Sequence, residues 1–344
     1  MSLQAAPPAR VLVTGGAGYI GSHTAQLLSE RGREVWVYDN LSHGHVQAVD
    51  PDRLIVGDLA DTGLLEQALR ERAIEAVIHF AAFINVGESA LDPRKYYHNN
   101  LVNSLNLLAA MGRAKVDRLV FSSTCATYGV PLETPITEEE PQKPINAYGR
   151  AKLAVEWALA DYSQAYGLGY AALRYFNAAG ASADGRLGED HDPETHLIPL
   201  ILQVALGQRS HIEVFGVDYP TADGTCVRDY IHVEDLAAAH LLALDKLRRG
   251  SRLAYNIGAG RGCSVREVIH VCEQVTGVTI PVVEAPRRPG DPAVLVADPR
   301  KAMNELGWKP RYQDLRSIVE PAWRWHQRHP RGYQDSIALD QHKE

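Results

Sequence analysis

Short apolar runs alternate with longer amphipathic stretches between residue 10 and about residue 177. Apolar runs of a few residues are typical of buried strands, and strands that alternate with helices indicate repeated β-α units and a parallel sheet. We therefore predict an α/β protein built on a Rossmann-type, doubly wound parallel sheet. The predicted strands are residues 11–14, 34–38, 53–56, 76–80, 118–122 and 170–174, and the predicted helices lie near residues 20–31, 63–71, 94–114 and 148–165.

The first predicted strand leads directly into a glycine-rich turn, GGAGYIG at residues 15–21. Glycines at this spacing permit a tight turn and let backbone N–H groups at a helix N-terminus approach a pyrophosphate. The next strand ends in Asp39, and a carboxylate there accepts hydrogen bonds from a ribose and repels a 2′-phosphate. An ordinary glycine turn with a surface Asp is the alternative. The prediction is an NAD site, rather than an NADP site, formed by Gly15, Gly18, Tyr19, Ile20, Gly21, Asp39 and Asn40.

Two later turns fit the same cofactor site. Asp58 and Leu59 follow the third predicted strand, and Phe80, Ala81 and Ala82 follow the fourth. Asp58 is placed to bond the adenine amino group, and the small alanines leave room for the cofactor. An Asp at a strand end is, however, more often a helix cap than a ligand.

A tyrosine and a lysine four residues apart, Tyr148 and Lys152, lie in a predicted helix. This spacing puts both side chains on one helix face. An ammonium beside a phenol favours the phenolate, which can then act as a general base. The alternative is an ordinary exposed Tyr and Lys. The run Ser122-Ser123-Thr124 at the end of the preceding strand favours catalysis, because a hydroxyl there can face the same substrate oxygen.

With these residues, the chain resembles the extended short-chain dehydrogenase/reductase family and, within it, the UDP-glucose 4-epimerases. The resemblance extends over nearly the whole chain. It implies that Thr124, Tyr148 and Lys152 are the family's catalytic Ser/Thr, Tyr and Lys, and that Asn99 and Phe176 lie near the nicotinamide. It rests on VTGGAGYIGSH at residues 13–23, DNLS at 39–42, VGES at 86–89, LRYFN at 173–177 and GTCVRDYIHV at 224–233.

The activity that the resemblance implies is reversible epimerisation at C4 of UDP-galactose and UDP-glucose, with tightly bound NAD and a transient 4-keto sugar. In this scheme Tyr148 removes the proton of the C4 hydroxyl, and Thr124 bonds the C4 oxygen. Lys152 holds the nicotinamide ribose and lowers the pKa of Tyr148.

For the UDP end, the resemblance points to Arg228 and Arg288 at the diphosphate, since the planar arginine fork binds phosphate oxygens in pairs. Asp291 is expected at a ribose hydroxyl, Asn177 near the diphosphate and Phe215 beside the uracil. Arg288 taken alone is equally compatible with a solvated basic loop.

Three positions depart from the best-known pattern of these epimerases. Ile84 stands where many members have a Lys that reaches the cofactor. His196 stands where Asn is frequent near the substrate phosphates. Leu295 stands where some members have a bulky Tyr, and we hypothesise that it admits N-acetylated sugars, which turnover of UDP-N-acetylglucosamine would test.

The loops after residue 177 are rich in Gly, Asp, His and Pro, as in residues 183–195 and 215–224, and interrupt shorter elements. We predict that residues 1–176 form mainly the NAD-binding domain. Residues 177–344 would form mainly a smaller α/β nucleotide-sugar-binding part, and the chain is allowed to cross between the two. The ligand is expected outside the carboxyl ends of the strands.

Other functions are also weighed. A 4,6-dehydratase needs an acid pair after the catalytic Thr, but Cys125 and Ala126 follow Thr124. A C4 epimerase for another UDP-sugar (N-acetylhexosamine, glucuronate or pentose) stays open as the alternative. A non-catalytic NAD sensor would have little need for Thr124, Tyr148 and Lys152 together.

Charge and composition limit the kinds of molecule that this protein is expected to bind. The formal net charge of −7 disfavours nucleic acid and anionic membranes, and no apolar run is long enough to span a membrane. Four sparse cysteines indicate a reduced, cytoplasmic protein. The 14 histidines include no ligand spacing such as H-E-x-x-H, so no metal site is predicted. Residues 94–114 and 148–165 resemble the helices that the family pairs in a homodimer.

Overall fold

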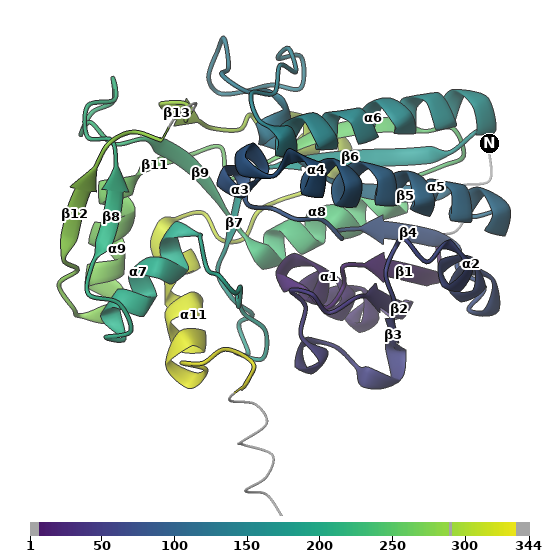
Figure 1. Cartoon of the computed structure of the whole chain (residues 1–344), viewed down its shortest axis with the longest axis horizontal. Helices are drawn as coiled ribbons and strands as arrows, with labels where there is room; N and C mark the ends of the chain where they lie inside the picture. The colour runs from purple at the N-terminus through teal and green to yellow at the C-terminus, as the bar shows by residue number, and fades with distance from the viewer. Residues whose placement is uncertain (1–6, 289–290, 335–344) are drawn as a thin grey trace, which may run out of the picture.

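Seven parallel strands form the central sheet of the protein, a computed structural model that describes residues 7–288 and 291–334 (Figure 1). The strands are β1 (Arg10–Thr14), β2 (Glu34–Asp39), β3 (Leu54–Val56), β4 (Ala76–His79), β5 (Arg118–Thr124), β6 (Gly169–Tyr175) and β10 (Arg252–Ile257). Their order across the sheet is β10-β6-β5-β4-β1-β2-β3, and every neighbouring pair is parallel. The order reverses between β1 and β4, which is where doubly wound sheets bind their ligands. The predicted fold class is confirmed.

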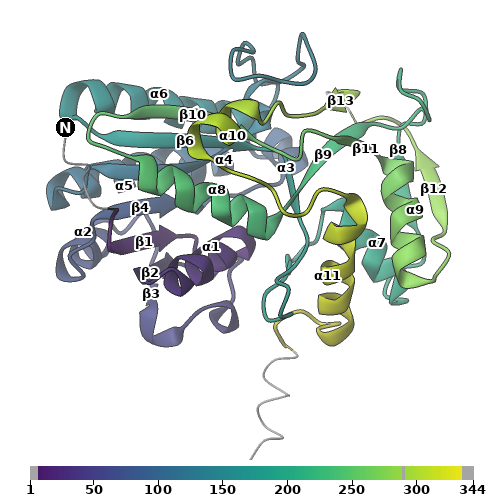
Figure 2. The ribbon, with the colours of Figure 1, turned by 180° about the vertical axis from the view of Figure 1, so that it is seen from behind.

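Helices cover both faces of this sheet (Figure 2). Side chains of a strand alternate between the two faces, so Val11 and Val13 enter one apolar core while Leu12 enters the other. The first core receives α1 (Tyr19–Glu30) and α8 (Val233–Lys246), and the second receives α2 (Thr62–Glu71), α5 (Asn103–Ala114) and α6 (Ala147–Tyr166).

The helix predicted at residues 94–114 is in fact three successive segments. These are α4 (Pro93–Tyr96), the π-helical turn η3 (Tyr97–Val102) and α5. A π turn adds a residue to the helical repeat, which the sequence pattern does not reveal and which is frequent at functional sites.

One strand of the large sheet comes from the C-terminal half of the chain. Residues 252–257 form β10, which pairs with β6, and α8 packs on the same sheet. The chain therefore returns to the first domain well after residue 176. The prediction allowed a crossing but did not locate it, because strand pairing between distant segments leaves no local signal.

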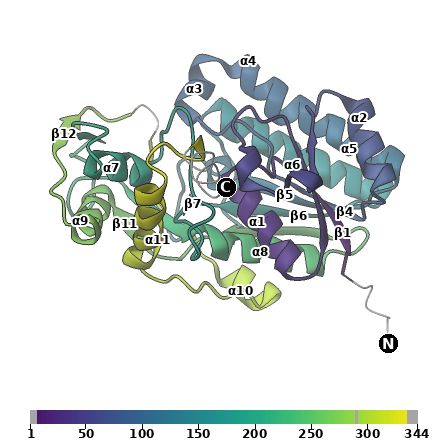
Figure 3. The ribbon, with the colours of Figure 1, turned by 90° about the horizontal axis from the view of Figure 1, so that it is seen from below.

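A smaller part of the chain lies beside the sheet (Figure 3). Its core is lined by α7, α9 and α11, and β9 pairs with β7 and β13 in parallel and with β11 in antiparallel orientation. The elements of the smaller part are β7 (Asn177–Ala179), β8 (Ile212–Phe215), β9 (Val227–His232), β11 (Gly262–Ser264), β12 (Val282–Ala285), β13 (Val294–Leu295), α7 (Leu197–Ala205), α9 (Val265–Thr276) and α11 (Leu315–Arg328).

The other short elements of the chain are α3 (Val86–Leu91), α10 (Arg300–Leu306), η1 (Val46–Ala48), η2 (Pro51–Arg53) and η4 (Cys125–Thr127).

In the described ranges, the helices are all too short or too polar to cross a membrane.

The buried carboxylate of Asp229 bonds segments of both parts. Asp229 of β9 accepts hydrogen bonds from the backbone N–H groups of Ala259 (2.7 Å) and Gly260 (3.0 Å), which follow β10, and of Ala297 (3.1 Å), which follows β13. Burial raises the pKa of Asp229 to about 7, although these three N–H groups lower it. Its two oxygens thus hold the edge of the large sheet against the small one.

We expect Asp229→Asn to lower the free energy of unfolding by about 1–3 kcal/mol, because the new NH₂ group leaves at least one buried N–H without an acceptor. Urea denaturation followed by circular dichroism measures this loss. The control is Asp117→Asn, whose carboxylate is 41% exposed and 3.7 Å from Arg249. A surface pair of this kind contributes about 0–1 kcal/mol. Equal losses in the two variants would contradict the role assigned to Asp229.

Candidate active site

The glycine-rich turn brings three backbone segments into close contact. Gly15 has φ +68°, and a Cβ atom there would lie 2.5 Å from the backbone N of Ala81. A Cβ on Gly21 would lie 2.2 Å from the carbonyl oxygen of Gly15. Side chains are therefore excluded where β1, the end of β4 and the start of α1 meet. No side chain caps the N-terminus of α1 at Gly18, so its first N–H groups are free to hold an anion.

The acid predicted to bind the ribose lies beside this turn. Asp39 at the end of β2 accepts hydrogen bonds from the N–H groups of Ala17 (3.0 Å) and Leu41 (2.8 Å). A carboxylate has further lone pairs for ribose hydroxyls. Burial raises the pKa of Asp39, although these two N–H groups lower it. Its position fits the predicted cofactor role.

Asp58 has its two oxygens engaged locally. Asn40 donates to one oxygen (2.7 Å), and the N–H of Ala60 donates to the other (2.8 Å). The structure thus places Asp58 in a turn-capping role and brings it to Asn40, whereas Leu59 is buried in the core under β2. An adenine contact by Asp58 stays a prediction.

The segment after β4 lines the same edge. The N–H groups of Phe80 (2.8 Å) and Ala81 (3.1 Å) both donate to the carbonyl oxygen of Thr14. Asn99 lies in η3 and donates to Asn100 (3.0 Å). Asn100 accepts from the N–H of Phe83 (2.9 Å) and donates to its carbonyl oxygen (2.8 Å), an anchoring role that we did not predict.

These residues fit a dinucleotide. The uncapped helix start, the sites where only glycine fits and the neighbouring acid all lie at the carboxyl ends of adjacent strands, as pyrophosphate and ribose binding require. Ile20 follows in the first turn of α1, and Tyr19 is held by its hydroxyl, which donates to the carbonyl oxygen of Gly180 (2.7 Å).

The predicted catalytic side chains meet at the end of β5. Tyr148 and Lys152 are buried on one face of α6, which begins at the cap Asn146. Thr124 is the last residue of β5, and its side chain lies close enough to Tyr148 to lower the pKa of the phenol against the larger effect of burial. Lys152 donates from Nζ to the carbonyl oxygen of Ser122 (2.8 Å).

Burial is the largest influence on the pKa values of both Tyr148 and Lys152. Burial raises the pKa of Tyr148 above its usual value, Tyr175 raises it further, and the Thr124 hydroxyl lowers it. Burial lowers the pKa of Lys152 to about 7, against the opposing carboxylate of Glu156. Lys152 is itself desolvated and donates to a backbone carbonyl, and its expected lowering of the Tyr148 pKa stays a prediction.

A buried ion pair supports this catalytic edge. Arg174 of β6 contacts Glu156 of α6 at 2.6 Å, and Ser123 of β5 donates to the same carboxylate at 2.5 Å. These two contacts hold α6 on β5 and β6, which fixes Tyr148 and Lys152 relative to Thr124. Arg174 belongs to the LRYFN motif, but its partner on α6 was not predicted.

The predicted nucleotide-binding residues form two groups. Arg228 of β9 lies opposite Leu295 of β13 and forms a short ion pair with Asp291. The guanidinium of Arg288 lies 4.0 Å from the centre of the Phe215 ring. The two groups are neighbours of the same thiol. Burial raises the pKa of Cys226, Arg228 and Arg288 lower it, and Asp291 raises it.

This nucleotide side adjoins the catalytic side. Cys125, next to Thr124, has a pKa that burial raises to about 12 and that Arg228 lowers. Cys125, Phe176 and Leu295 also belong to one apolar cluster. Asn177 donates to the carbonyl oxygen of Asp229 (2.9 Å), which places it at the join between the sheets. The pocket width assigned to Leu295 stays a prediction.

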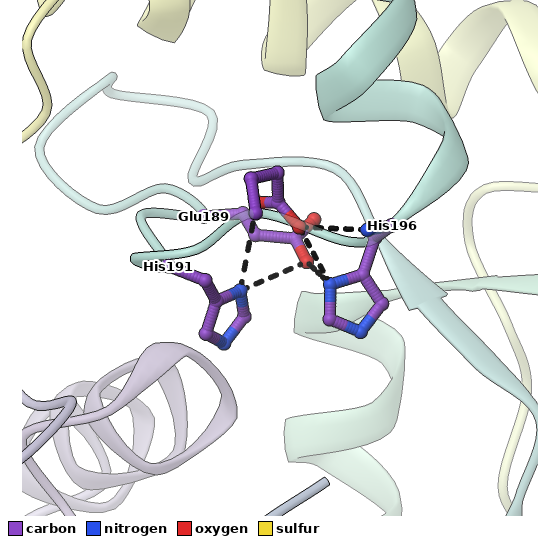
Figure 4. A group of neighbouring side chains, drawn as sticks. Glu189, His191 and His196 are labelled. Carbon is purple, nitrogen blue, oxygen red and sulfur yellow. Dashed lines mark hydrogen bonds and ion pairs between the residues drawn. The ribbon is translucent and has the colours of Figure 1, made fainter. Parts of the chain in front are cut away.

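His196 belongs to a different group of side chains. Its Nδ1 lies 2.8 Å from Glu194 and 3.0 Å from Glu189, and His191 lies beside it (Figure 4). Burial lowers the pKa of His196, but the two carboxylates outweigh this effect and raise it to about 10. The prediction of no metal-ligand cluster missed this group, although Glu-x-His-x-x-Glu-x-His is readable at residues 189–196. A substrate contact by His196 stays a prediction.

Comparisons with known proteins agree with this geometry. A model of the NAD dependent epimerase/dehydratase family matches residues 11–258. The UDP-glucose 4-epimerase of Halalkalibacterium halodurans is 54% identical over 94% of this chain and 97% of its own. The crystal structure of the UDP-glucose 4-epimerase from Brucella ovis in complex with NAD aligns with a TM-score of 0.89 at 52% identity, over 92% of this chain and 98% of its own. That of the Bifidobacterium longum enzyme in complex with NAD⁺ and UDP aligns with a TM-score of 0.90 at 40% identity, over 94% and 99%.

Because the family model spans most of the chain and the relatives match it almost end to end, the resemblance read from the motifs is confirmed, and the chain belongs to the NAD dependent epimerase/dehydratase family.

Proposed function

We propose that this chain catalyses the reversible epimerisation of UDP-galactose and UDP-glucose at C4, with tightly bound NAD and a transient 4-keto sugar. The observation that carries the proposal is the buried Tyr148, which lies beside the buried Thr124 at the same sheet edge as the glycine-rich turn. The support from relatives is that UDP-glucose 4-epimerases match the chain at 54% and 51% identity over 94% of its length.

The chain's own groups would hold NAD at the carboxyl edge of the sheet. The N–H groups at the start of α1 bind the diphosphate, and Asp39 accepts from an adenosine ribose. Lys152 is assigned to the nicotinamide ribose. When bound, NAD supplies the hydride acceptor and donor that the two half-reactions at C4 require.

Proton transfer is assigned to the tyrosine. Tyr148 Oη accepts the proton of the C4 hydroxyl as the carbonyl forms, and returns it to the C4 oxygen when the opposite face is reduced. Thr124 bonds the same oxygen and keeps it directed at Oη. Because this edge is buried, water is excluded while the keto sugar exists.

The nucleotide end is held by the second part of the chain. Arg228 and Arg288 are assigned to the diphosphate, Asp291 to a ribose hydroxyl and Phe215 to the uracil. Binding energy from this remote end holds the substrate while the sugar turns over between the two half-reactions. Among the alternatives, a C4 epimerase for another UDP-sugar would show as a higher kcat/KM for UDP-N-acetylgalactosamine or UDP-glucuronate than for UDP-galactose.

We also propose that the chain acts in the cytoplasm, where its free cysteines stay reduced, and as a homodimer. The support is exposed apolar surface: Trp157 of α6 is 64% exposed, and Val102 of the neighbouring η3 is 42% exposed.

Tyr148→Phe is expected to lower kcat for UDP-galactose about 10²–10⁴-fold, because the general base is lost while binding contacts remain. Arg228→Met is expected instead to raise KM roughly tenfold or more, because charged hydrogen bonds to the diphosphate are lost. Proton NMR of the C4 inversion, with NAD supplied, gives both constants. Tyr166→Phe, at an exposed position of the same helix, is the control and should match the wild type. Unchanged kcat in Tyr148→Phe would sink the mechanism.

Lys152→Met should move the rising limb of the kcat/KM against pH profile to higher pH by at least about one unit. The sign follows from the base: Tyr148 works deprotonated, and a nearby ammonium favours the phenolate, so its removal raises the pKa of Tyr148. Arg150→Met on the exposed side of α6 is the control. If the limb stays in place while activity falls, Lys152 acts only in binding.

Sedimentation velocity should show a dimer for the wild type and a monomer for Trp157→Glu, because a charge at the apolar contact would have to be desolvated. A monomeric wild type would rule out the dimer without touching the proposed chemistry.

A further inference from the structure

Four side chains converge in the loop between β7 and α7. Glu189, His191, Glu194 and His196 each offer one ligand atom, and these four atoms all lie within 4.8 Å of one another. Both histidines direct Nδ1 at the carboxylates (Figure 4). The cluster lies outside the set of groups assigned to proton transfer.

The spacing of these atoms matches a compact coordination sphere. Ligand atoms about 2.0–2.1 Å from a tetrahedral zinc ion lie roughly 3.3 Å from one another. The four nitrogen-to-oxygen distances are 2.8 and 3.0 Å at His196 and 3.4 and 3.6 Å at His191. They bracket the required value. Glu194 faces the two histidines with different oxygens, so a rotation of its carboxylate and small shifts of the other side chains would bring one atom of each residue onto one ion.

The carboxylates are buried to a degree that requires a compensating charge. The side chains of Glu189 and Glu194 are only 4% and 5% exposed. Glu189 Oε1 and His191 Nδ1 are buried without a hydrogen bond of good geometry. The charge opposite the carboxylates is thus either two imidazolium rings or one divalent cation with neutral rings.

We propose that Glu189, His191, Glu194 and His196 bind one divalent transition-metal ion, with zinc the best match. Two imidazole nitrogens and two carboxylate oxygens suit zinc, whereas magnesium and calcium prefer oxygen ligands alone. Binding displaces the ring protons of His191 and His196, so up to two protons leave for each ion bound.

A metal here would fasten a loop to the cofactor edge of the sheet. The His191 ring lies edge-on to Tyr19, 6.2 Å between centroids, and Tyr19 begins α1 directly after the glycine-rich turn. In the same loop, the carbonyl oxygen of Asp190 bonds His45 (3.0 Å), which belongs to the segment after β2. Four protein ligands leave no open position, as in structural zinc sites, so the ion stabilises rather than reacts.

The test uses the full chain with NAD bound, stripped of metal by a chelator and titrated with zinc chloride. We expect one zinc per chain by mass spectrometry of the metal content, a rise in the midpoint of thermal unfolding, and proton release on binding. Glu189→Gln should lose more than about tenfold in zinc affinity, since even groups that only orient a ligand contribute that much.

Asp184→Asn is the matched control. This loop carboxylate bonds Ser182 and Arg186 and takes no part in the cluster, so the variant should keep its zinc. If Glu189→Gln fails to fold, cobalt(II) added to the wild type serves instead, since tetrahedral imidazole and carboxylate ligation gives intense visible bands.

Two results would overturn the proposal: Glu189→Gln that retains zinc as well as the wild type does, or wild-type protein that binds neither zinc nor cobalt. The cluster would then be two imidazolium rings paired with two carboxylates. Metal content is measured apart from turnover, so this failure is distinct from failure of the epimerase proposal.

Discussion

The buried carboxylate of Asp229 is the contact on which the site geometry depends. It binds backbone N–H groups that follow β10 in the large sheet and β13 in the small one. Its neighbour in sequence, Arg228, is thereby held close to Cys125 and Thr124. One polar group can do this because each N–H would otherwise be buried without an acceptor, which costs more than an ordinary hydrogen bond contributes. The residues proposed for chemistry and those proposed for nucleotide binding are thus brought to one place.

Burial, more than pairwise charge, governs the electrostatics of the catalytic edge. It opposes ionisation of Tyr148 and protonation of Lys152. A low-dielectric site strengthens every charge that a bound ligand brings, so the protonation states of these groups depend strongly on what binds there. Arg174 and Glu156 are also buried, but their opposite charges compensate for the loss of water. They meet at 2.6 Å and hold α6 to the sheet.

The loop before α7 illustrates a different use of charge. Its carboxylates face the two histidines and lie next to Tyr19, at the start of the helix assigned to the cofactor diphosphate. Loops that carry several buried titratable groups need either shared protons or a cation to stay folded. Because this loop lies between the two parts, whether protons or a cation balance its carboxylates affects the structure of both parts.

The sequence by itself determined the local features. Periodicity predicted six strands to within a residue or two at each end. The glycine turn predicted the close approach of β1 and α1, and the spacing of Tyr148 and Lys152 predicted that they share a helix face. Each of these signals lies within one element or turn. Only the tertiary structure decided the rest. It placed residues 252–257 beside β6, bonded Lys152 to a backbone carbonyl and gathered His196 with Glu189. These outcomes depend on burial and on contacts between distant segments, which no local pattern of residues encodes.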